Sequence, residues 1–225
     1  MLFHRPKSYI KSYVKRNGRL TATQKEYLKN INNNKNYTKI SVKKINFQNL
    51  FNNTNQCILD IGFGDGMLLI NIANKYPNIN FIGIEVYEQG IVNILKQIDK
   101  YKLSNLRIIN NDAILVLQDF IKNKTLYGVS LFFPDPWPKK KHNKRRIINN
   151  DFLNLISKKI IKKGFIKIVT DWTNYADNII SLFNNNNKYL KISDIYIYKE
   201  RDLTKFEKKG MSCDHKITNL CYELI

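Results

Sequence analysis

The chain has 225 residues, and 43% of them are hydrophobic, which is enough for one α/β domain with a substantial core. No apolar stretch approaches the roughly 20 residues of a membrane-spanning helix, and the N-terminus lacks the apolar segment of a secretory signal. The three cysteines and three histidines are scattered without metal-ligand spacing. We therefore expect a cytoplasmic protein without membrane association and without a metal ion.

The net charge of +20 is distributed unevenly along the chain. Residues 1–50 hold 12 Lys and Arg against one acid, a net charge of +11, and residues 136–225 hold 19 against nine, a net charge of +10. Residues 51–135 hold seven against eight, a net charge of −1. A general bias toward Lys would raise the charge everywhere. The two basic flanks therefore predict a polyanion-binding surface around a central site.

We interpret residues 1–45, which are basic and rich in tyrosine, as an N-terminal arm with one helix, followed by a domain of residues 46–225. In that domain short apolar runs alternate with amphipathic stretches, which predicts a doubly wound parallel sheet. The predicted strands cover residues 56–61, 80–86, 105–110, 127–133 and 165–170. The predicted helices cover residues 66–76, 88–100, 113–121, 149–161 and 174–183. Two later strands, at 190–198 and 219–224, are expected to pair antiparallel at the far edge.

A glycine-rich loop, Asp60-Ile61-Gly62-Phe63-Gly64-Asp65-Gly66, follows the first predicted strand. Glycines such as Gly62 and Gly64 let the backbone approach a ligand closely. The G-x-G-x-G spacing differs from the G-x-G-x-x-G of dinucleotide sites, and Asp60 and Asp65 would repel a pyrophosphate. S-adenosylmethionine carries no phosphate and has a cationic amine and sulfonium, so the loop favours it as cofactor over the dinucleotide of a dehydrogenase.

Two further acids follow the next predicted strands. Glu85 ends the second strand, where a carboxylate can accept hydrogen bonds from ribose hydroxyls. Asp112 follows the third strand and can face the amino group of adenine, although the alternative is that it only caps the next helix. Acids at the carboxyl ends of three successive strands favour a cofactor site.

The segment after the fourth predicted strand is Leu131-Phe132-Phe133-Pro134-Asp135-Pro136-Trp137-Pro138. Its prolines predict a rigid turn that presents Asp135 and an aromatic face to a planar base. The N1–H and N2–H of guanine match a carboxylate, and its N7 carries a lone pair. Methylation at N7 needs alignment and nearby negative charge more than a strong base. The alternative is that Asp135 caps the turn and Trp137 packs in the core.

A basic run, Lys139-Lys140-Lys141-His142-Asn143-Lys144-Arg145-Arg146, follows directly. Such a run is commonly a solvated face, but its position beside the proline turn favours contacts with RNA phosphates. The fifth predicted strand ends at Thr170-Asp171-Trp172, another carboxylate and aromatic pair at the same end of the sheet. The later segment 201–207 has the spacing of an ordinary loop.

Taken in order, these motifs resemble the bacterial tRNA (guanine-N7)-methyltransferase family. The most specific parts are the proline-tryptophan segment with its basic run and the final Thr204-Lys205-Phe206-Glu207. The arm segment 11–21 also resembles that family, whereas 184–200 resembles it little. Many members have Glu at the position of Asp60, and this shorter acid is still expected to reach the ligand.

The resemblance implies a Rossmann-like class I methyltransferase fold, with a seven-stranded, mostly parallel sheet and an antiparallel edge strand. It implies methyl transfer from S-adenosylmethionine to guanine N7 in the tRNA variable loop, which forms 7-methylguanosine, by a monomer or homodimer. It implies Asp135 as the catalytic residue. The implied cofactor contacts are Asp60, Gly62, Gly64, Glu85, Asp112 and Asp135. The implied substrate contacts are Lys139, Asp171, Thr204, Lys205, Phe206 and Glu207. The implied RNA contacts are Lys141, His142, Asn143, Lys144, Arg145 and Arg146.

Two alternatives remain open. Methyltransferases that act on exocyclic amines of adenine, cytosine or guanine use an Asp/Asn-Pro-Pro-aromatic turn, which Asp135-Pro136-Trp137 resembles without the second adjacent proline. A non-catalytic RNA-binding protein on a decayed methyltransferase scaffold is the other alternative. Such decay would erode the cofactor acids first, and all of them are present here.

Overall fold

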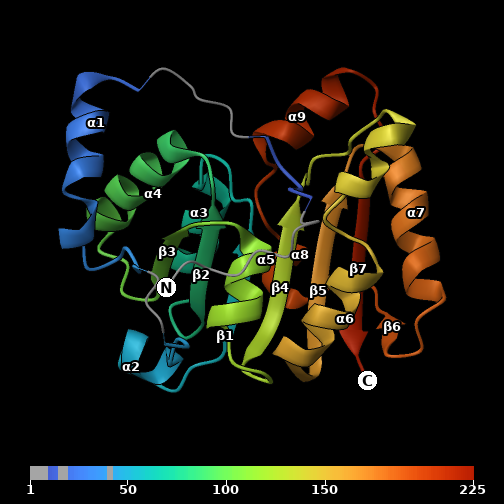
Figure 1. The fold of residues 1–225 in the computed structure, drawn as a ribbon, viewed down its shortest axis with the longest axis horizontal. Coiled ribbons are helices and arrows are strands. Elements are labelled where there is room, and N and C mark those ends of the chain that lie inside the picture. The colour runs from blue at the N-terminus through green and yellow to red at the C-terminus, as the bar shows by residue number, and fades with distance from the viewer. Residues whose placement is uncertain (1–9, 15–19, 40–42) are drawn as a thin grey trace.

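The computed structural model describes residues 10–14, 20–39 and 43–225, and a seven-stranded sheet forms its centre (Figure 1). The strand order is β3-β2-β1-β4-β5-β7-β6. The strands are β1 Cys57–Ile61, β2 Asn80–Glu85, β3 Leu106–Asn110, β4 Leu126–Phe132, β5 Ile160–Thr170, β6 Tyr189–Lys191 and β7 Thr218–Leu224. The first five strands pair in parallel, and β7 pairs antiparallel with both β5 and β6. The predicted doubly wound sheet with an antiparallel edge is therefore confirmed.

The helices cover both faces of this sheet and bury one hydrophobic cluster on each. The cluster on one face includes residues of α2, η2, α6 and α7, and the cluster on the other includes residues of α3, α4 and α8. Figure 1 shows α5 and α6 in front of the sheet and α8 behind it. The helices up to η2 are α1 Ala22–Lys29, η1 Ile31–Asn33, α2 Phe47–Phe51, α3 Met67–Lys75, α4 Glu88–Tyr101, α5 Ala113–Leu115 and η2 Val116–Phe120. The later helices are η3 Lys140–Arg145, α6 Asn150–Lys159, α7 Thr173–Asn184, α8 Tyr196–Lys199 and α9 Lys205–Ser212.

The strand expected at residues 190–198 is wrong beyond its first two residues. Strand β6 ends at Lys191, and the chain then turns into α8. Asp194 lies between the two elements, and its carboxylate pairs at 2.8 Å with the buried ammonium of Lys167 on β5. Beyond Asp194, the side chains of Ile197 and Tyr198 in α8 are buried in the hydrophobic cluster on one face of the sheet. The alternation of apolar and polar residues therefore indicated burial correctly but not the element.

The described part of the N-terminal segment packs against the domain. Thr21 and Gln24 form a capping box that starts α1, and the ammonium of Lys96 on α4 lies 5.6 Å from the centre of the Tyr27 ring. A parallel bridge joins Tyr37 to Ile108 of β3. The division between arm and domain at residue 45 stays a prediction, and residues 1–9, 15–19 and 40–42 lie outside the described residues.

Among the described residues, no helix has both the length and the apolar character needed to cross a membrane. Nor, within the same ranges, do three or more His, Cys, Asp or Glu side chains gather as they do around a metal ion.

Candidate active site

The glycine loop after β1 leaves room for a ligand against its backbone. Gly62 and Gly64 have φ angles of 77° and 62°, and a Cβ built on either would meet no atom within 4 Å. These conformations favour glycine because other L-residues are strained there. On its other side the loop is tightly packed, since a Cβ on Gly90 of α4 would lie 2.1 Å from the carbonyl oxygen of Gly64. Helix α4 therefore fixes the loop while its ligand side stays open.

Asp60 is a buried acid at the end of β1 with an unused oxygen. Its side chain is 3% exposed, and its Oδ1 has no hydrogen-bond partner among the described residues. Burial, together with the charge of Glu85, raises the pKa of Asp60 to about 7, against the opposing hydrogen bond from Ser130. A buried acceptor without a partner is rare and costs stability. Asp60 is therefore suited to receive a cationic or hydrogen-bond-donating ligand.

Glu85 ends β2 and is oriented by three backbone amides. The amide of Gly64 donates to one carboxylate oxygen at 2.9 Å, and the amides of Val86 and Tyr87 donate to the other at 2.6 and 3.1 Å. Burial raises the pKa of Glu85, these hydrogen bonds lower it, and the charge of Asp135 raises it further. At the carboxyl end of the sheet, Glu85 therefore interacts electrostatically with Asp60 and with Asp135.

Asp112 follows β3 at the same end of the sheet and caps α5. Its carboxylate accepts hydrogen bonds from the amides of Ile114 and Leu115 at 2.9 and 3.4 Å, and its side chain is buried. The capping role expected as an alternative is thus present in the structure. A capping carboxylate can still accept a further hydrogen bond, because an ionised carboxylate has about four lone-pair sites.

The proline turn after β4 is held in place by contacts of Trp137. Phe133 and Trp137, on either side of Asp135, adopt positive φ angles of 53° and 45°. The indole of Trp137 donates to the carbonyl oxygen of Ser12 at 3.0 Å, and the guanidinium of Arg145 lies 4.7 Å from its ring centre. Trp137 therefore connects the N-terminal segment to the turn, and Arg145 lies over its ring. Asp135 itself is exposed.

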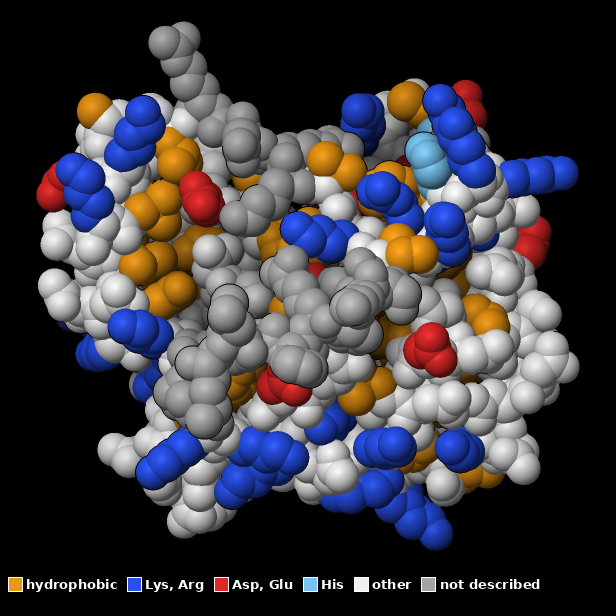
Figure 2. Space-filling view, viewed as in Figure 1, with side chains coloured by type: hydrophobic (Ala, Val, Ile, Leu, Met, Phe, Trp, Pro, Cys, Tyr) orange, Lys and Arg blue, Asp and Glu red, His pale blue; other side chains and the backbone are white. Residues whose placement is uncertain are grey.

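Helix η3 carries most of the basic run on the surface. Figure 2 shows Lys and Arg side chains gathered around a histidine in this region, and further basic side chains along the lower edge of the molecule. Arg146 differs from the rest of the run because it is 4% exposed. Its guanidinium donates to the carbonyl oxygen of Pro136 at 2.9 Å and to the side chain of Asn174 at 2.8 Å. Arg146 thus braces the proline turn from within the protein.

Helix α9 lies across the carboxyl end of the sheet, above β4 and β5 (Figure 1). Lys205 forms a 2.8 Å ion pair with Asp65 of the glycine loop, and the Phe206 ring stacks on Phe133 with centroids 5.8 Å apart. Phe206 remains 60% exposed. The carboxylate Oδ2 of Asp171, after β5, lies 3.4 Å from the Nδ1 of His215, which follows α9. In the segment 201–207, residues 201–204 form the expected loop, whereas residues 205–207 start α9. Helix α9 and the residues directly after it contact the loops after β1, β4 and β5.

Glu207 holds the start of α9 in place. It forms a capping box with Thr204 and a bidentate ion pair with Arg201, at 2.6 and 2.5 Å. Glu207 is 2% exposed and Arg201 is 7% exposed. Burial alone would raise the pKa of Glu207, but the hydrogen bonds from Arg201 and Thr204 outweigh it and lower this pKa. Its stabilising contribution is therefore present at neutral pH and disappears as the pH falls through the lowered pKa.

We expect Glu207→Gln to lower the free energy of unfolding by about 3 kcal/mol, because it leaves the buried guanidinium of Arg201 without its charge partner. Urea unfolding followed by circular dichroism measures this change. The matched control is Glu200→Gln, since Glu200 is 82% exposed and pairs with Lys75 at 3.5 Å; we expect it to change stability by less than about 0.5 kcal/mol. Equal effects of the two substitutions would contradict the anchoring role of Glu207.

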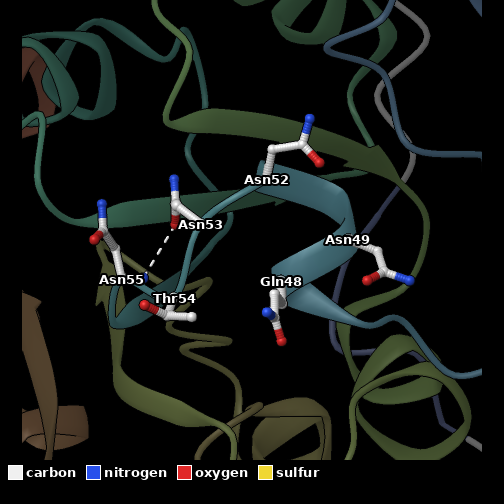
Figure 3. Close-up of a pocket in the computed structure, with 6 residues that line it drawn as sticks. All are labelled: Gln48, Asn49, Asn52, Asn53, Thr54 and Asn55. Atoms are coloured by element: carbon white, nitrogen blue, oxygen red, sulfur yellow. Dashed lines mark hydrogen bonds between the residues drawn. The ribbon is translucent and has the colours of Figure 1, made fainter.

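A polar depression lies elsewhere, at the amino end of β1 (Figure 3). Its lining residues come from α2 and the turn into β1 and carry no charge. They are Gln48, Asn49, Asn52, Asn53, Thr54 and Asn55. Because it lies at the opposite end of β1 from the glycine loop, it takes no part in the candidate site.

Three residues that matter to the site were not singled out by the sequence. Arg201 anchors Glu207, and Tyr198 donates to the hydroxyl of Ser130 at 3.0 Å beside Asp60. Ser130 is the single polar residue in the run Gly128-Val129-Ser130-Leu131-Phe132, and this was the only available signal. Which side chain it contacts depends on the pairing of β1 with β4, which local sequence does not specify.

Comparison with known proteins agrees with this geometry. A family model described as "Putative methyltransferase" matches residues 54–220. The tRNA (guanine-N(7)-)-methyltransferase of Francisella philomiragia is 39% identical over 218 residues, which cover 96% of this chain and 95% of that protein. The protein of the same name from Buchnera aphidicola subsp. Baizongia pistaciae is 41% identical over 220 residues, which cover 96% of this chain and 90% of that protein.

Solved structures show the same fold at low sequence identity. The 16S rRNA methyltransferase KamB aligns with a TM-score of 0.57 and 12% identity, over 79% of this chain and 92% of that chain. An antibiotic-related methyltransferase aligns with a TM-score of 0.53 and 16% identity, over 83% of this chain and 95% of that chain.

The chain is a methyltransferase with the class I fold, as defined by its strand order, the glycine loop after β1 and the acids at the ends of β1 and β2. The extent and identity of the sequence matches narrow this class further. The chain belongs to the tRNA (guanine-N(7)-)-methyltransferase family.

Proposed function

We propose that this protein transfers a methyl group from S-adenosylmethionine to N7 of a guanine in the variable loop of tRNA, which forms 7-methylguanosine. The observation that carries this proposal is a group of three carboxylates beside an open glycine loop, in which the charge of Glu85 acts on Asp60 and the charge of Asp135 acts on Glu85. Negative charge of this kind suits a cationic donor and opposes a pyrophosphate. The names of the relatives supply the base and the RNA.

The residues at the carboxyl end of the sheet fit S-adenosylmethionine, which would supply an electrophilic methyl group. The unpartnered Oδ1 of Asp60 would accept from the ammonium group of the ligand. Glu85, held by three amides, would accept from the ribose hydroxyls, and Asp112 would face the adenine. The open side of Gly62 and Gly64 leaves the ligand room to lie against the loop backbone.

Asp135 would hold the guanine by accepting its N1–H and N2–H. With the base held in this way, the N7 lone pair would be free to accept the methyl group that S-adenosylmethionine would supply; the sulfur would keep the electrons of the broken carbon–sulfur bond, and the guanine would gain the positive charge. No proton leaves the base in this step, so a carboxylate that aligns the ring and opposes its new charge is sufficient. The exposed ring of Phe206 offers a stacking surface for a base.

The tRNA would lie over η3 and the start of α9. Lys139, Lys141, His142, Asn143, Lys144 and Arg145 are proposed to contact RNA, whereas the buried Arg146 would support the turn beneath them. Asp171, Thr204, Lys205 and Phe206 are proposed to contact the substrate near the reacting base, and Glu207 would act by anchoring α9. Because tRNA is the proposed substrate, we also propose that the protein acts in the cytoplasm.

Reversing the charge of Lys140, Lys141 and Lys144 to Glu should weaken tRNA binding at least about tenfold at 150 mM salt. It should also reduce the slope of log affinity against log salt by about 0.7–0.9 for each phosphate that the variant no longer neutralises. Filter binding over a salt series measures both quantities. The control reverses Lys162, Lys163 and Lys188, which are also exposed and lie near the amino end of the sheet. If both triple variants weaken binding equally, η3 is not the RNA-binding surface.

The proposed reaction is tested by incubating the protein with labelled S-adenosylmethionine and tRNA from a strain that lacks 7-methylguanosine, then mapping the labelled nucleoside. We expect label in 7-methylguanosine. Label in an amino-methylated nucleoside would assign the protein to the exocyclic-amine class. Binding of tRNA without any labelled product would favour a non-catalytic RNA-binding protein.

A further inference from the structure

A row of buried polar residues crosses the sheet beneath the candidate cofactor site. Strand pairing places Asp60 of β1 beside Ser130 of β4, and Ser130 beside Lys167 of β5. Their exposed fractions are 3%, 0% and 1%. On the other side of Asp60, the paired residue of β2 is Gly83. Polar side chains at the centre of a sheet cost stability unless they are hydrogen-bonded, so the partners of this row matter.

Helix α8 supplies the partner of Ser130. The hydroxyl of Tyr198 donates to Ser130 Oγ at 3.0 Å, and Tyr198 is 3% exposed. A hydroxyl that accepts one hydrogen bond still has its own proton to donate. Strand pairing places Ser130 directly beside Asp60, and hydrogen bonding from the Ser130 side chain lowers the pKa of the Asp60 carboxyl. The Oδ1 of Asp60 remains without a partner among the described residues. The chain Tyr198–Ser130–Asp60 thus leads from the core to the edge of the site.

We propose that Ser130 and Tyr198 are positioning residues for the cofactor site, and that their hydroxyls orient the Asp60 carboxylate so that Oδ1 is the atom presented to S-adenosylmethionine. The inference rests on the proposed function, because it concerns binding of the methyl donor. An alanine at position 130 would fill the sheet without a buried hydroxyl, and a phenylalanine at position 198 would pack equally well. We infer that the energetic cost of burying both hydroxyls is offset because they orient the Asp60 carboxylate.

The contact between Ser130 and Asp60 also affects the pKa of Asp60. Burial and Glu85 favour the protonated carboxyl, whereas the hydrogen bond from Ser130 favours the ionised form and lowers the pKa of Asp60. Removing that hydrogen bond therefore raises this pKa and moves the decline of ligand affinity toward higher pH. Several titratable and charged groups surround Asp60, Ser130 and Tyr198. They are Glu85 from β2, Lys167 from β5, Asp194 opposite Lys167, Arg201 near Tyr198, and Tyr198 itself from α8.

The test is isothermal titration of the full-length protein with S-adenosylmethionine, without tRNA, from pH 6 to pH 8.5. We expect Ser130→Ala to bind about tenfold more weakly than wild type at pH 7.5, because it removes a hydrogen bond to a charged group. Tyr198→Phe, which acts through Ser130, should bind about threefold more weakly. In both variants the pH at which affinity declines should move upward.

Tyr189→Phe is the matched control, because it also removes a buried tyrosine hydrogen bond, here a 2.9 Å bond to the carbonyl oxygen of Leu153. It should keep wild-type affinity and its pH profile at a similar cost in thermal stability. Ser130→Thr, which retains the hydroxyl, should recover affinity relative to Ser130→Ala. If Ser130→Ala and Tyr198→Phe both keep the affinity and pH profile of wild type, the inference is overturned but the proposed function is not. A wild-type protein that does not bind S-adenosylmethionine would overturn the proposed function and the inference with it.

Discussion

Asp135→Ala is expected to lower the rate of methyl transfer to tRNA by at least about 100-fold while the protein stays folded. Asp135 is exposed on a turn that Phe133, Trp137 and Arg146 hold in place through their own contacts. Removing its side chain therefore leaves no cavity in the core. The variant lacks the acceptor for the guanine N–H groups and the negative charge opposite a ring that becomes positive. Single-turnover assays at saturating S-adenosylmethionine measure the chemical step directly.

The matched control for Asp135 is Asp119→Ala, which removes another exposed carboxylate, in η2 near the amino end of β4. Its turnover should equal that of wild type. Asp135→Asn should be nearly as slow as Asp135→Ala, because an amide places N–H donors against the N–H donors of guanine. If Asp135→Ala keeps more than about a third of the wild-type rate, Asp135 has no part in the chemical step.

Asp60→Asn is expected to weaken S-adenosylmethionine binding about 100-fold at pH 8, because the ammonium group would have no buried charged acceptor. In wild type the affinity should also depend on pH. The pKa of Asp60 is raised to about 7 by burial and by Glu85, and a cationic ligand favours the ionised form. Binding below pH 7 therefore requires loss of a proton, and affinity should fall by up to about tenfold per pH unit. Glu85, whose pKa is also raised, acts in the same direction.

The stability of the protein without ligand should depend on pH in the opposite direction to the affinity for S-adenosylmethionine. A carboxyl whose pKa is raised in the folded state opposes folding once it ionises, so the free energy of unfolding should fall as the pH rises from about 4 toward 7. Asp60→Asn should remove most of both dependences, since an amide does not titrate. Urea unfolding and isothermal titration across this range measure the two effects. A pH-dependent affinity that persists unchanged in Asp60→Asn would assign the titration to another group.

The ends of the parallel strands were predictable from sequence because the signal there is local. An apolar run followed by Asp60 and glycines, or by Glu85, marks a strand end whatever its neighbours are. The carboxyl ends of parallel strands then meet at one end of the sheet, which is where the structure has both acids. The order of the motifs along the chain also carried the family resemblance that the comparisons confirm.

Contacts between distant segments were not predictable in the same way. Ser130, Tyr198 and Arg201 gain their importance from strand register and from how α8 and α9 fold back over the sheet. Residues 190–198 alternate apolar and polar positions, and the sequence does not reveal that the strand ends at Lys191 or that Asp194 pairs with Lys167. Glu207 is an acid beside lysines in the sequence, and only the fold shows that it is buried.

A crystal structure of the protein bound to S-adenosylhomocysteine tests most directly whether these acids form the methyl-donor site. We predict the amino group of the ligand at Asp60 Oδ1, its ribose at Glu85, its adenine beside Asp112 and its sulfur on the side of Asp135. A ligand that binds away from the glycine loop, or that makes no contact with Asp60 and Glu85, would contradict the account.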